Sequence, residues 1–402
     1  MADEKVVVIG VGYVGLPAAL LLAQTGCTVI GVDTDARRVE ELNSAALHLG
    51  EAEIAHLIND PSVRNNLRAA PTPEAGDVFI VAVPTPVDPR KKIADLNDLE
   101  AAVNSIVPVL APGNLVIIES TIPPLTCREV ITPILECGGL TVGTDLQLAH
   151  CPERILPGDV FREITTNGRV IGGTTPEAAE RAAGVYKRFV RGPLVLTDDV
   201  TAEMVKLLEN TYRDVNIALA NEIAAVAETV GVDPLQMIDL ANLHPRVSLL
   251  KPGIGVGGHC IPLDPWFIKQ VDPSNSRLIF AARLINDEQP FRIAAKIRRA
   301  LRDVTAPRIV MIGATYKPNV PDTRESPALQ IAEMLREDGY DIAQHDPLVE
   351  GMQYTSLASI AKDADCLALL VEHDVVKREL AEQRAVIEAA MRRPTILRFY
   401  AA

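Results

Sequence analysis

The 402-residue sequence lacks the features that would suggest an oxidising compartment or a membrane. Its six cysteines show no CxxC pairing and are too sparse for a disulfide framework in a chain of this length. Gly, Pro or charged residues interrupt every apolar run before it reaches the length of a membrane span. No signal-peptide pattern precedes the first strand-like run. We therefore expect a cytoplasmic protein that does not enter a membrane.

Basic runs, metal-binding spacings, repeats and low-complexity tracts are missing as well. The formal net charge is −14, with both signs spread along the chain, which argues against nucleic acid or an anionic membrane as the main partner. Neither zinc-like nor EF-hand spacings occur, so we expect no metal. With 48% hydrophobic residues, the chain can bury a sizeable core in two or three domains. An anionic substrate would need a local cationic pocket.

Two stretches of the chain alternate strand-like and helical patterns. In residues 5–195 the clearest apolar strands are Val6–Ile9, Thr28–Val32, Val78–Val83 and Leu115–Ile118, with helical patterns over 16–24 and 99–110. From Pro307 onward the strand-like runs are Arg308–Ile312, Asp341–Gln344, Cys366–Val371 and Thr395–Phe399, with a helix expected over 327–337. Such alternation is typical of parallel sheets with helices on both faces. We therefore expect an α/β fold with two Rossmann-like, doubly wound domains.

Between these stretches, residues 198–230 contain neither proline nor glycine. The pattern predicts one helix of about 50 Å at a rise of about 1.5 Å per residue. Thr197 or Asp198 can cap its start and Gly231 can end it. Such a helix is long enough to join two domains and to carry a dimer interface. Further helices are expected over 234–242 and 276–302, which makes the middle region helical.

The first strand leads into Gly10-Val11-Gly12-Tyr13-Val14-Gly15, which opens a helix. The glycines permit a tight turn and let a pyrophosphate reach the helix N-terminus. Asp33 ends the next strand, where a ribose-binding acid belongs, about 20 residues further on. The context predicts a dinucleotide site; the alternative is a glycine-rich turn in an unrelated α/β protein. Asp33 favours NAD over NADP because a carboxylate repels a 2′-phosphate, although Arg38 can neutralise such a phosphate.

Three polar residues follow predicted strands, and ligands of open α/β sheets bind at the carboxyl ends of strands. Thr85, in Val83-Pro84-Thr85-Pro86, and Thr121, in Glu119-Ser120-Thr121, can hydrogen-bond cofactor or substrate, or serve only in turns and caps. Glu153 follows a third strand-like run. It can act as a general base on water, or simply pair with the neighbouring Arg154.

The segment from Pro252 to Pro265 combines a glycine-rich loop with one cysteine, Cys260, and a carboxylate, Asp264. The glycines let a ligand approach the backbone closely. A thiolate beside a proton acceptor suits a nucleophile, and with a dinucleotide site it suggests oxidation through a covalent thiol adduct. Free cysteines are more often buried hydrophobic residues. Core packing is the interpretation for Cys27, Cys127, Cys137 and Cys366, whereas Cys151 and the ring of His259 stay unassigned.

Lys206, Asn210 and Arg213 share one face of the predicted long helix. A solvated helix face would show the same pattern. A thiol that adds to an aldehyde, however, generates an oxyanion, and an ammonium with an amide N–H is a suitable clamp for it. Arg213 can meet a phosphate. Two further cationic clusters can hold a diphosphate, with surface salt bridges as the alternative: His244-Pro245-Arg246, and Tyr316-Lys317 with Arg324.

These motifs, in this order, resemble the UDP-glucose/GDP-mannose dehydrogenase superfamily, which oxidises a nucleotide sugar at C6 from alcohol to acid. The resemblance rests on 10–15, 83–86, 152–154, 202–213, 257–260 and 322–327. It implies an N-terminal NAD domain (1–196), a central helical dimerisation domain (197–302) and a C-terminal nucleotide-sugar domain (303–402). A homodimer through the long helix and NAD as cofactor are implied too.

The resemblance also implies roles for individual residues. Cys260 would capture the aldehyde as a thiohemiacetal, which a second oxidation turns into a thioester that water releases. Lys206 and Asn210 match the oxyanion-stabilising pair, Asp264 the aspartate that assists water or proton transfer, and Glu153, with Thr121 near it, the glutamate of thioester hydrolysis. NAD contacts match Gly10, Gly12, Tyr13, Val14, Gly15, Asp33, Arg38, Thr85, Thr121 and Arg324. Substrate contacts match Arg154, Ile155, Lys206, Asn210, Arg213, His244, Arg246, Gly257, Tyr316 and Lys317.

Within the superfamily, residues 244–247, 252–260 and 264–267 look most like the branch that oxidises UDP-N-acetyl-D-mannosamine to the uronate for surface polysaccharides. The runner-up substrates are UDP-N-acetylglucosamine and UDP-glucose. Leu125 departs from the family pattern, since relatives usually carry glycine there, and it can shift the loop near Thr121. A β-hydroxyacid dehydrogenase would need no cysteine, and a non-catalytic nucleotide-sugar sensor would lack the catalytic residues.

Overall fold

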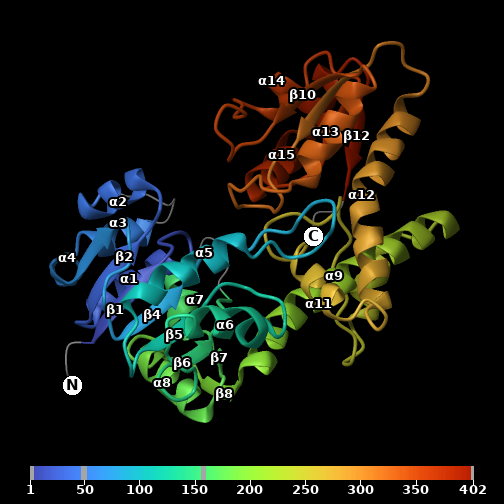
Figure 1. The fold of residues 1–402 in the computed structure, drawn as a ribbon. Coiled ribbons are helices and arrows are strands. Elements are labelled where there is room, and N and C mark those ends of the chain that lie inside the picture. Colours follow the sequence, from blue (N-terminus) through green and yellow to red (C-terminus); the bar gives the residue numbers. More distant parts are fainter. Residues whose placement is uncertain (1–3, 47–51, 155–159, 400–402) are drawn as a thin grey trace. The chain divides into compact units, whose positions relative to one another are not determined.

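A computed structural model describes residues 4–46, 52–154 and 160–399 (Figure 1). The chain divides into two compact units, and the division falls inside the longest helix. The first comprises residues 1–209 with 266–272, and the second comprises 210–265 with 273–402. Each contains one sheet with its own hydrophobic core. This division does not test the predicted domain boundaries at 196/197 and 302/303, which stay a prediction.

The first unit contains an eight-stranded sheet in the order β3-β2-β1-β4-β5-β6-β7-β8. Its strands are β1 Lys5–Ile9, β2 Thr28–Val32, β3 Leu67–Ala70, β4 Val78–Val81, β5 Leu115–Ile118, β6 Gln147–His150, β7 Arg169–Gly173 and β8 Leu194–Asp198. The helices are α1 Gly15–Gln24, α2 Ala36–Asn43, α3 Ala52–Ile58, α4 Pro61–Asn66, α5 Asn97–Ile106, α6 Thr132–Glu136, α7 Val160–Thr166 and α8 Pro176–Tyr186, with short turns η1 Val107–Val109 and η2 Cys127–Ile131.

Helices cover both faces of this sheet, because successive side chains of a strand point to opposite sides. Val6 and Val8 of β1 pack in one core cluster with Leu16 of α1. Val7 of the same strand packs in a second cluster with Leu99 of α5. The expected doubly wound α/β domain is confirmed. One pair departs from the parallel pattern: β6 and β7 are antiparallel and share a short ladder.

The helical region contains α9 Asp199–Val230, α10 Pro234–Ala241, α11 Asp264–Val271 and α12 Arg277–Leu301. The predicted long helix is confirmed, and α9 has 32 residues. Asp198 caps its start, since the Asp198 carboxylate accepts the backbone N–H of Thr201 at 3.0 Å. Gly231 follows its end at φ +75°, a left-handed conformation that glycine adopts without strain.

The second unit contains a four-stranded parallel sheet in the order β10-β9-β11-β12. Its strands are β9 Arg308–Ile312, β10 Asp341–His345, β11 Cys366–Leu369 and β12 Thr395–Arg398, and its helices are α13 Pro327–Glu337, α14 Leu357–Ile360 and α15 Asp374–Ala390. Ile309 and Met311 of β9 face one core cluster, whereas Val310 and Ile312 face the other. The expected second doubly wound domain is therefore confirmed.

The cysteines follow the predicted burial with one exception. Cys27, Cys127 and Cys366 are buried, as expected, and so is Cys151. Cys137 is exposed, so its assignment to the core was wrong. It lies just after the short helix α6, and its Sγ lies 3.2 Å from the carbonyl oxygen of Pro133. Within residues 4–46, 52–154 and 160–399, no helix combines the length and the apolar character needed to cross a membrane.

Candidate active site

The glycine turn after β1 is held in a shape that only glycine allows. Gly10 has φ +88°, and a Cβ on it would lie 2.6 Å from the carbonyl oxygen of Ala82. A Cβ on Gly15 would lie 2.0 Å from the carbonyl oxygen of Gly10. The turn is therefore closed upon itself and on the end of β4, and it leads directly into α1. Such a turn can accept a pyrophosphate at the helix N-terminus.

Asp33 lies directly after β2 and contacts this turn. Its Oδ2 accepts the backbone N–H of Val11 at 3.2 Å and an Nη1–H of Arg38 at 3.1 Å. The carboxylate is thus fixed where a ribose hydroxyl can donate to it. Arg38 is paired with Asp33, so its charge is already compensated. The structure therefore favours NAD over the 2′-phosphorylated cofactor, which settles the alternative that Arg38 left open.

The hydroxyl of Thr85 also fits a bound cofactor. Its Oγ1 lies just beyond β4, is buried, and has no hydrogen-bond partner among the described residues. A buried hydroxyl without a partner costs free energy, so such an atom usually has a partner that the protein itself does not supply. Together with the glycine turn and Asp33, it shows that the chain fits a dinucleotide at this edge of the first sheet.

The loop after β5, which carries Thr121, is held from α9 by Glu203, a residue that no sequence pattern assigned to the site. Glu203 is fully buried, and its carboxylate accepts the N–H groups of Leu125 at 2.6 Å and Cys127 at 2.9 Å. Burial raises the pKa of Glu203 to about 7, against the opposing effect of these hydrogen bonds. Leu125 has φ +73°, a left-handed conformation that glycine adopts more readily than leucine. The Glu203 contact explains how this leucine is held there.

Lys206 lies on α9 in a largely buried position, with only 9% of its surface exposed. This argues against the solvated helix face that was the alternative interpretation. His150, at the end of β6, is fully buried, and its pKa falls to about 3, mainly through burial and further through the positive charge of Lys206. His150 is therefore a neutral imidazole. The neutral His150 ring therefore adds no second positive charge beside Lys206.

Glu153 and Arg154 follow β6 within the first unit. Arg154 donates to the Glu209 carboxylate on α9 at 2.5 Å, so α9 holds the segment after β6 in addition to the loop after β5. Glu153 is half-buried. Ile155, predicted as a substrate contact, lies outside the described residues.

The cysteine loop comprises residues 252–265 of the second unit. It carries Cys260 and Asp264, and Asp264 contacts a third predicted residue, Asn210 of α9. Cys260 is exposed, and its carbonyl oxygen accepts the N–H groups of Leu263 at 3.1 Å and Asp264 at 2.9 Å. Asp264 begins α11, is almost fully buried, and its Oδ2 accepts an Nδ2–H of Asn210 at 2.6 Å. The loop thus holds Cys260 at the surface, one tight turn before a carboxylate and an amide that are hydrogen-bonded to each other.

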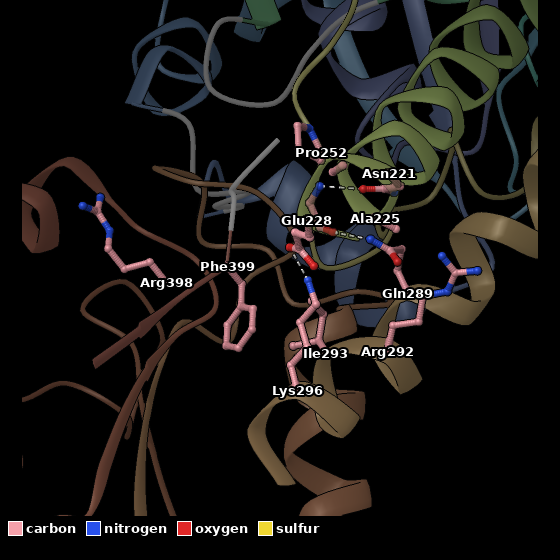
Figure 2. A pocket seen from close by; sticks show the side chains of 12 residues that line it. Asn221, Ala225, Glu228, Pro252, Gln289, Arg292, Ile293, Lys296, Arg398 and Phe399 are labelled. Atoms are coloured by element: carbon pink, nitrogen blue, oxygen red, sulfur yellow. Dashed lines mark hydrogen bonds and ion pairs between the residues drawn. The ribbon is translucent and has the colours of Figure 1, made fainter. Parts of the chain in front are cut away.

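Two buried amides fix the start of this loop, and Figure 2 shows them beside a cavity of about 130 Å³. The backbone N–H of Gly253 donates to Asn221 Oδ1 at 2.8 Å, and its carbonyl oxygen accepts from Gln289 Nε2 at 3.0 Å. The cavity also contains the ion pair of Lys296 with Glu228, at 2.6 Å. Nothing in the sequence marked Asn221 or Gln289, because their partners lie far away along the chain.

The predicted substrate residues differ in their surroundings. Tyr316 and Lys317 follow β9 and are half-buried, and burial raises the pKa of the Tyr316 hydroxyl. Arg324, predicted as an NAD contact, pairs with both oxygens of Asp322, with its Nε at 2.9 Å from each. Arg213, His244 and Arg246 are exposed. Within the exposed loop, the backbone N–H of Arg246 donates to His244 Nδ1 at 3.3 Å. The ligand contacts of all six residues stay predictions.

Comparisons with known proteins match all three parts of the chain. Residues 4–190 match the NAD binding domain, 200–288 the central domain and 310–398 the UDP binding domain of the UDP-glucose/GDP-mannose dehydrogenase family. The chain is 45% identical to a UDP-N-acetyl-D-mannosamine dehydrogenase of Methanocaldococcus jannaschii over 379 residues, which covers 93% of this chain and 87% of that protein.

Solved structures of two such enzymes are similar over nearly the whole length. The UDP-D-ManNAc dehydrogenase of Pyrococcus horikoshii has 39% identity and a TM-score of 0.91, with 98% of this chain and 95% of that one covered. The UDP-N-acetyl-mannosamine dehydrogenase of S. aureus has 38% identity and a TM-score of 0.90, with coverage of 98% and 94%. The chain therefore belongs to the UDP-glucose/GDP-mannose dehydrogenase family and is an NAD-dependent nucleotide-sugar dehydrogenase.

Proposed function

We propose that this enzyme oxidises UDP-N-acetyl-D-mannosamine at C6, from the alcohol to the acid, through a covalent adduct on Cys260. The observation that carries the proposal is the exposed Cys260 one turn before the Asp264–Asn210 pair. The 45% identity to a UDP-N-acetyl-D-mannosamine dehydrogenase supports the choice of sugar. The product would be a uronate for surface polysaccharides, made in the cytoplasm.

The residues divide the chemistry as follows. Two NAD⁺ molecules, bound in turn at the glycine turn and Asp33, would supply the oxidant, one for the hydride of the C6 alcohol and one for the hydride of the thiohemiacetal carbon. The thiolate of Cys260 forms a C–S bond to the aldehyde carbon, and the resulting thioester is cleaved by water to the acid and the thiol. Lys206 and Asn210, one turn apart on α9, donate to the oxyanion that develops on the former aldehyde oxygen. Each charge change is thus matched by a polar group of this chain.

Two carboxylates handle the protons. Asp264 receives the N–H of Asn210 and is nearly fully buried, so a proton that it takes from substrate or water is held away from bulk solvent. Glu153 acts as the general base that activates the water for thioester hydrolysis. Thr121 assists from the loop that Glu203 holds. The burial of Lys206 supports its proposed role at the oxyanion over that of a solvated surface lysine.

The binding contacts extend the same proposal. NAD is held by the turn from Gly10 to Gly15, with Asp33 on the ribose, and by Arg38, Thr85, Thr121 and Arg324. The nucleotide sugar is held by Arg154, Ile155, Lys206, Asn210, Arg213, His244, Arg246, Gly257, Tyr316 and Lys317. A single oxidation, as in a β-hydroxyacid dehydrogenase, would leave Cys260 without a purpose.

A panel of UDP-sugars tests the proposal. We expect about two NADH per sugar consumed on UDP-N-acetyl-D-mannosamine, because the four-electron oxidation needs two hydride transfers. UDP-N-acetylglucosamine and UDP-glucose are the controls, and we expect much slower turnover of both. Turnover of UDP-glucose with two NADH would refute the sugar while retaining the mechanism, and a ratio of one NADH on every sugar would refute the mechanism.

We further propose that the protein is a homodimer through α9. Six apolar residues of this helix are exposed, by 37% to 69%: Met204, Leu208, Tyr212, Leu219, Val226 and Val230. At about 100° per residue, all six fall within a sector of about 80° along the helix. Lys206, Asn210 and Arg213 lie on the opposite side. The exposed Glu222 lies at one margin of this sector, but an apolar stripe of this length favours burial against a second copy.

Charged substitutions in the stripe should separate the subunits. For Leu219→Glu combined with Val226→Glu we expect a monomer at micromolar concentration, because each carboxylate would be buried without a partner in the dimer. Light scattering after size-exclusion chromatography measures the mass. Val386→Glu is the control, since Val386 is a similarly exposed valine, on α15. A monomeric wild type, or a dimeric double variant, would contradict the proposed interface.

A further inference from the structure

At the carboxyl edge of the second sheet lies a histidine–aspartate pair that the proposed mechanism does not use. Asp346 follows β10 and His373 immediately precedes α15, and their side chains are 0% and 1% exposed. Nε2 of His373 lies 3.0 Å from Oδ2 of Asp346. A buried polar pair of this kind is kept only where all of its members are satisfied. Besides each other, both residues hydrogen-bond to the loop after β9, which comprises residues 313–326.

The hydrogen bonds decide where the ring proton of His373 resides. The backbone N–H of Asn319 donates to Nδ1 at 2.8 Å, so Nδ1 carries no proton. The single ring proton then sits on Nε2, which donates to Asp346. A second proton on the ring would point at the Asn319 N–H and break this bond. In this arrangement the ring of His373 accepts a hydrogen bond on one side and donates one on the other.

Asp346 and His373 hydrogen-bond to opposite ends of one segment of this loop, residues 314–319. Oδ2 of Asp346 accepts the N–H groups of Ala314 at 2.7 Å and Thr315 at 3.3 Å, at the start of the loop. His373 accepts from Asn319, which has φ +62° and whose side chain also donates to Asp374 at 2.9 Å. The backbone from 316 to 318 is therefore fixed at both of its ends. These three positions include Tyr316 and Lys317.

Tyr316, held in this way, forms the surface on which the cysteine loop rests. A Cβ on Gly257 would lie 2.7 Å from the Cβ of Tyr316, and one on Gly258 would lie 3.0 Å from Cε2 of its ring. The N–H of Gly258 donates to the carbonyl oxygen of Arg324 at 3.0 Å, at the other end of the same loop. Tyr316 itself is tied across the loop, since its N–H donates to Asp322 at 2.9 Å. Cys260 follows two residues after Gly258.

We propose that His373 and Asp346 are positioning residues for the nucleophile. They fix the loop after β9, the loop fixes Tyr316, and Tyr316 fixes Gly257 and Gly258 immediately before Cys260. Neither residue touches the reacting atoms. The inference rests on the proposed role of Cys260 for its meaning in catalysis, but the mechanical link between the two loops is independent of that role.

Three substitutions at one position separate the two bonds of the ring. His373→Phe keeps the bulk and removes both bonds, His373→Asn keeps an acceptor for Asn319, and His373→Gln keeps a donor for Asp346. For His373→Phe we expect amide hydrogen exchange in a peptide covering 255–262 to accelerate at least about tenfold. The two amide variants should give smaller increases. They carry the test if His373→Phe does not fold.

Arg392→Ala is the matched control. Arg392 pairs with Asp365, which directly precedes β11 and so lies at the amino ends of the strands, whereas His373 and Asp346 lie at their carboxyl ends. Its loss should lower the stability of the domain without accelerating exchange in 255–262. Exchange in 255–262 that stays at the wild-type rate in all three His373 variants, or that rises equally in Arg392→Ala, would overturn the proposal.

Kinetics then connect the link to catalysis. We expect His373→Phe to lower kcat by about tenfold or more, because a nucleophile displaced by a fraction of an ångström reacts far more slowly. His373→Asn should recover part of the rate, because it keeps an acceptor for the Asn319 N–H. If the wild type oxidises no UDP-sugar, the proposed function fails while the exchange experiment still decides the link between the loops. Faster exchange with an unchanged kcat would contradict the positioning role.

Discussion

Cys260→Ser should abolish formation of the sugar acid. We expect the rate of acid formation to fall by about a thousandfold or more, since loss of the nucleophile in a covalent enzyme can cost up to about a millionfold. A serine hydroxyl at this position has no deprotonated form at neutral pH comparable to a thiolate. The measurement is NADH production together with the acid, on the nucleotide sugar that the wild type prefers.

Cys137→Ser is the control for this experiment, because Cys137 is the other exposed cysteine and lies far along the chain from the cysteine loop. It should retain wild-type activity. An unchanged NADH yield in Cys260→Ser would rule out the thioester route. A second observation can be sought in Glu153→Gln, where slower hydrolysis should let the acylated peptide accumulate for mass spectrometry.

The largest expected effect on stability comes from Arg283→Ala. Arg283 of α12 and Asp214 of α9 form a buried ion pair at 2.5 Å, with side chains 2% and 0% exposed. Removing the guanidinium leaves the Asp214 carboxylate buried without its cation, and we expect the free energy of unfolding to fall by about 3–5 kcal/mol. Denaturant unfolding at neutral pH measures it. Asn286, which donates to Asp214 at 2.8 Å, compensates only part of the loss.

The pH dependence and a surface control sharpen this prediction. Burial raises the pKa of Asp214 above its usual 3.8 in spite of Arg283, so at a pH just above 3.8 the folded state binds this proton more tightly than the unfolded state does. Stability from this group therefore falls as pH rises, and the deficit of Arg283→Ala should shrink towards pH 4. Arg298→Ala removes an exposed pair of the same length, with Asp338, and should cost less than about 1 kcal/mol. Equal losses in both variants would show that burial is not the cause.

The fold could be predicted where the chain itself carries the signal. The fully buried strands β4 and β5 are short apolar runs, and α9 has no residue that breaks a helix. Strand β8 could not be found in this way, because its side chains are half-buried or exposed. The reversed pairing of β6 with β7 has no local signal, since strand direction depends on the path of the connection.

The candidate site divides along the same line. Cys260, Asp264 and the glycine turn belong to short local motifs, so the spacing of residues in the sequence predicts them. Glu203 lies within a stretch that resembles the family, but its contact with Leu125 spans 78 residues of sequence. Asn221 and His373 act through partners 32 and 54 positions away. Only the folded chain brings such partners together, and polar residues of this kind look like ordinary helix and loop positions in the sequence.

The length of α9 has a consequence for how this enzyme can evolve. From Glu203 to Asn221, one uninterrupted helix carries the residue that holds the Leu125 loop, the proposed oxyanion pair Lys206 and Asn210, the buried Asp214 and the amide that fixes the cysteine loop. Inserting or deleting a single residue within it would rotate everything beyond by about 100° and misdirect all later side chains at once. We therefore expect descendants of this protein to differ in loop length but to keep the number of residues between Glu203 and Asn221 of α9.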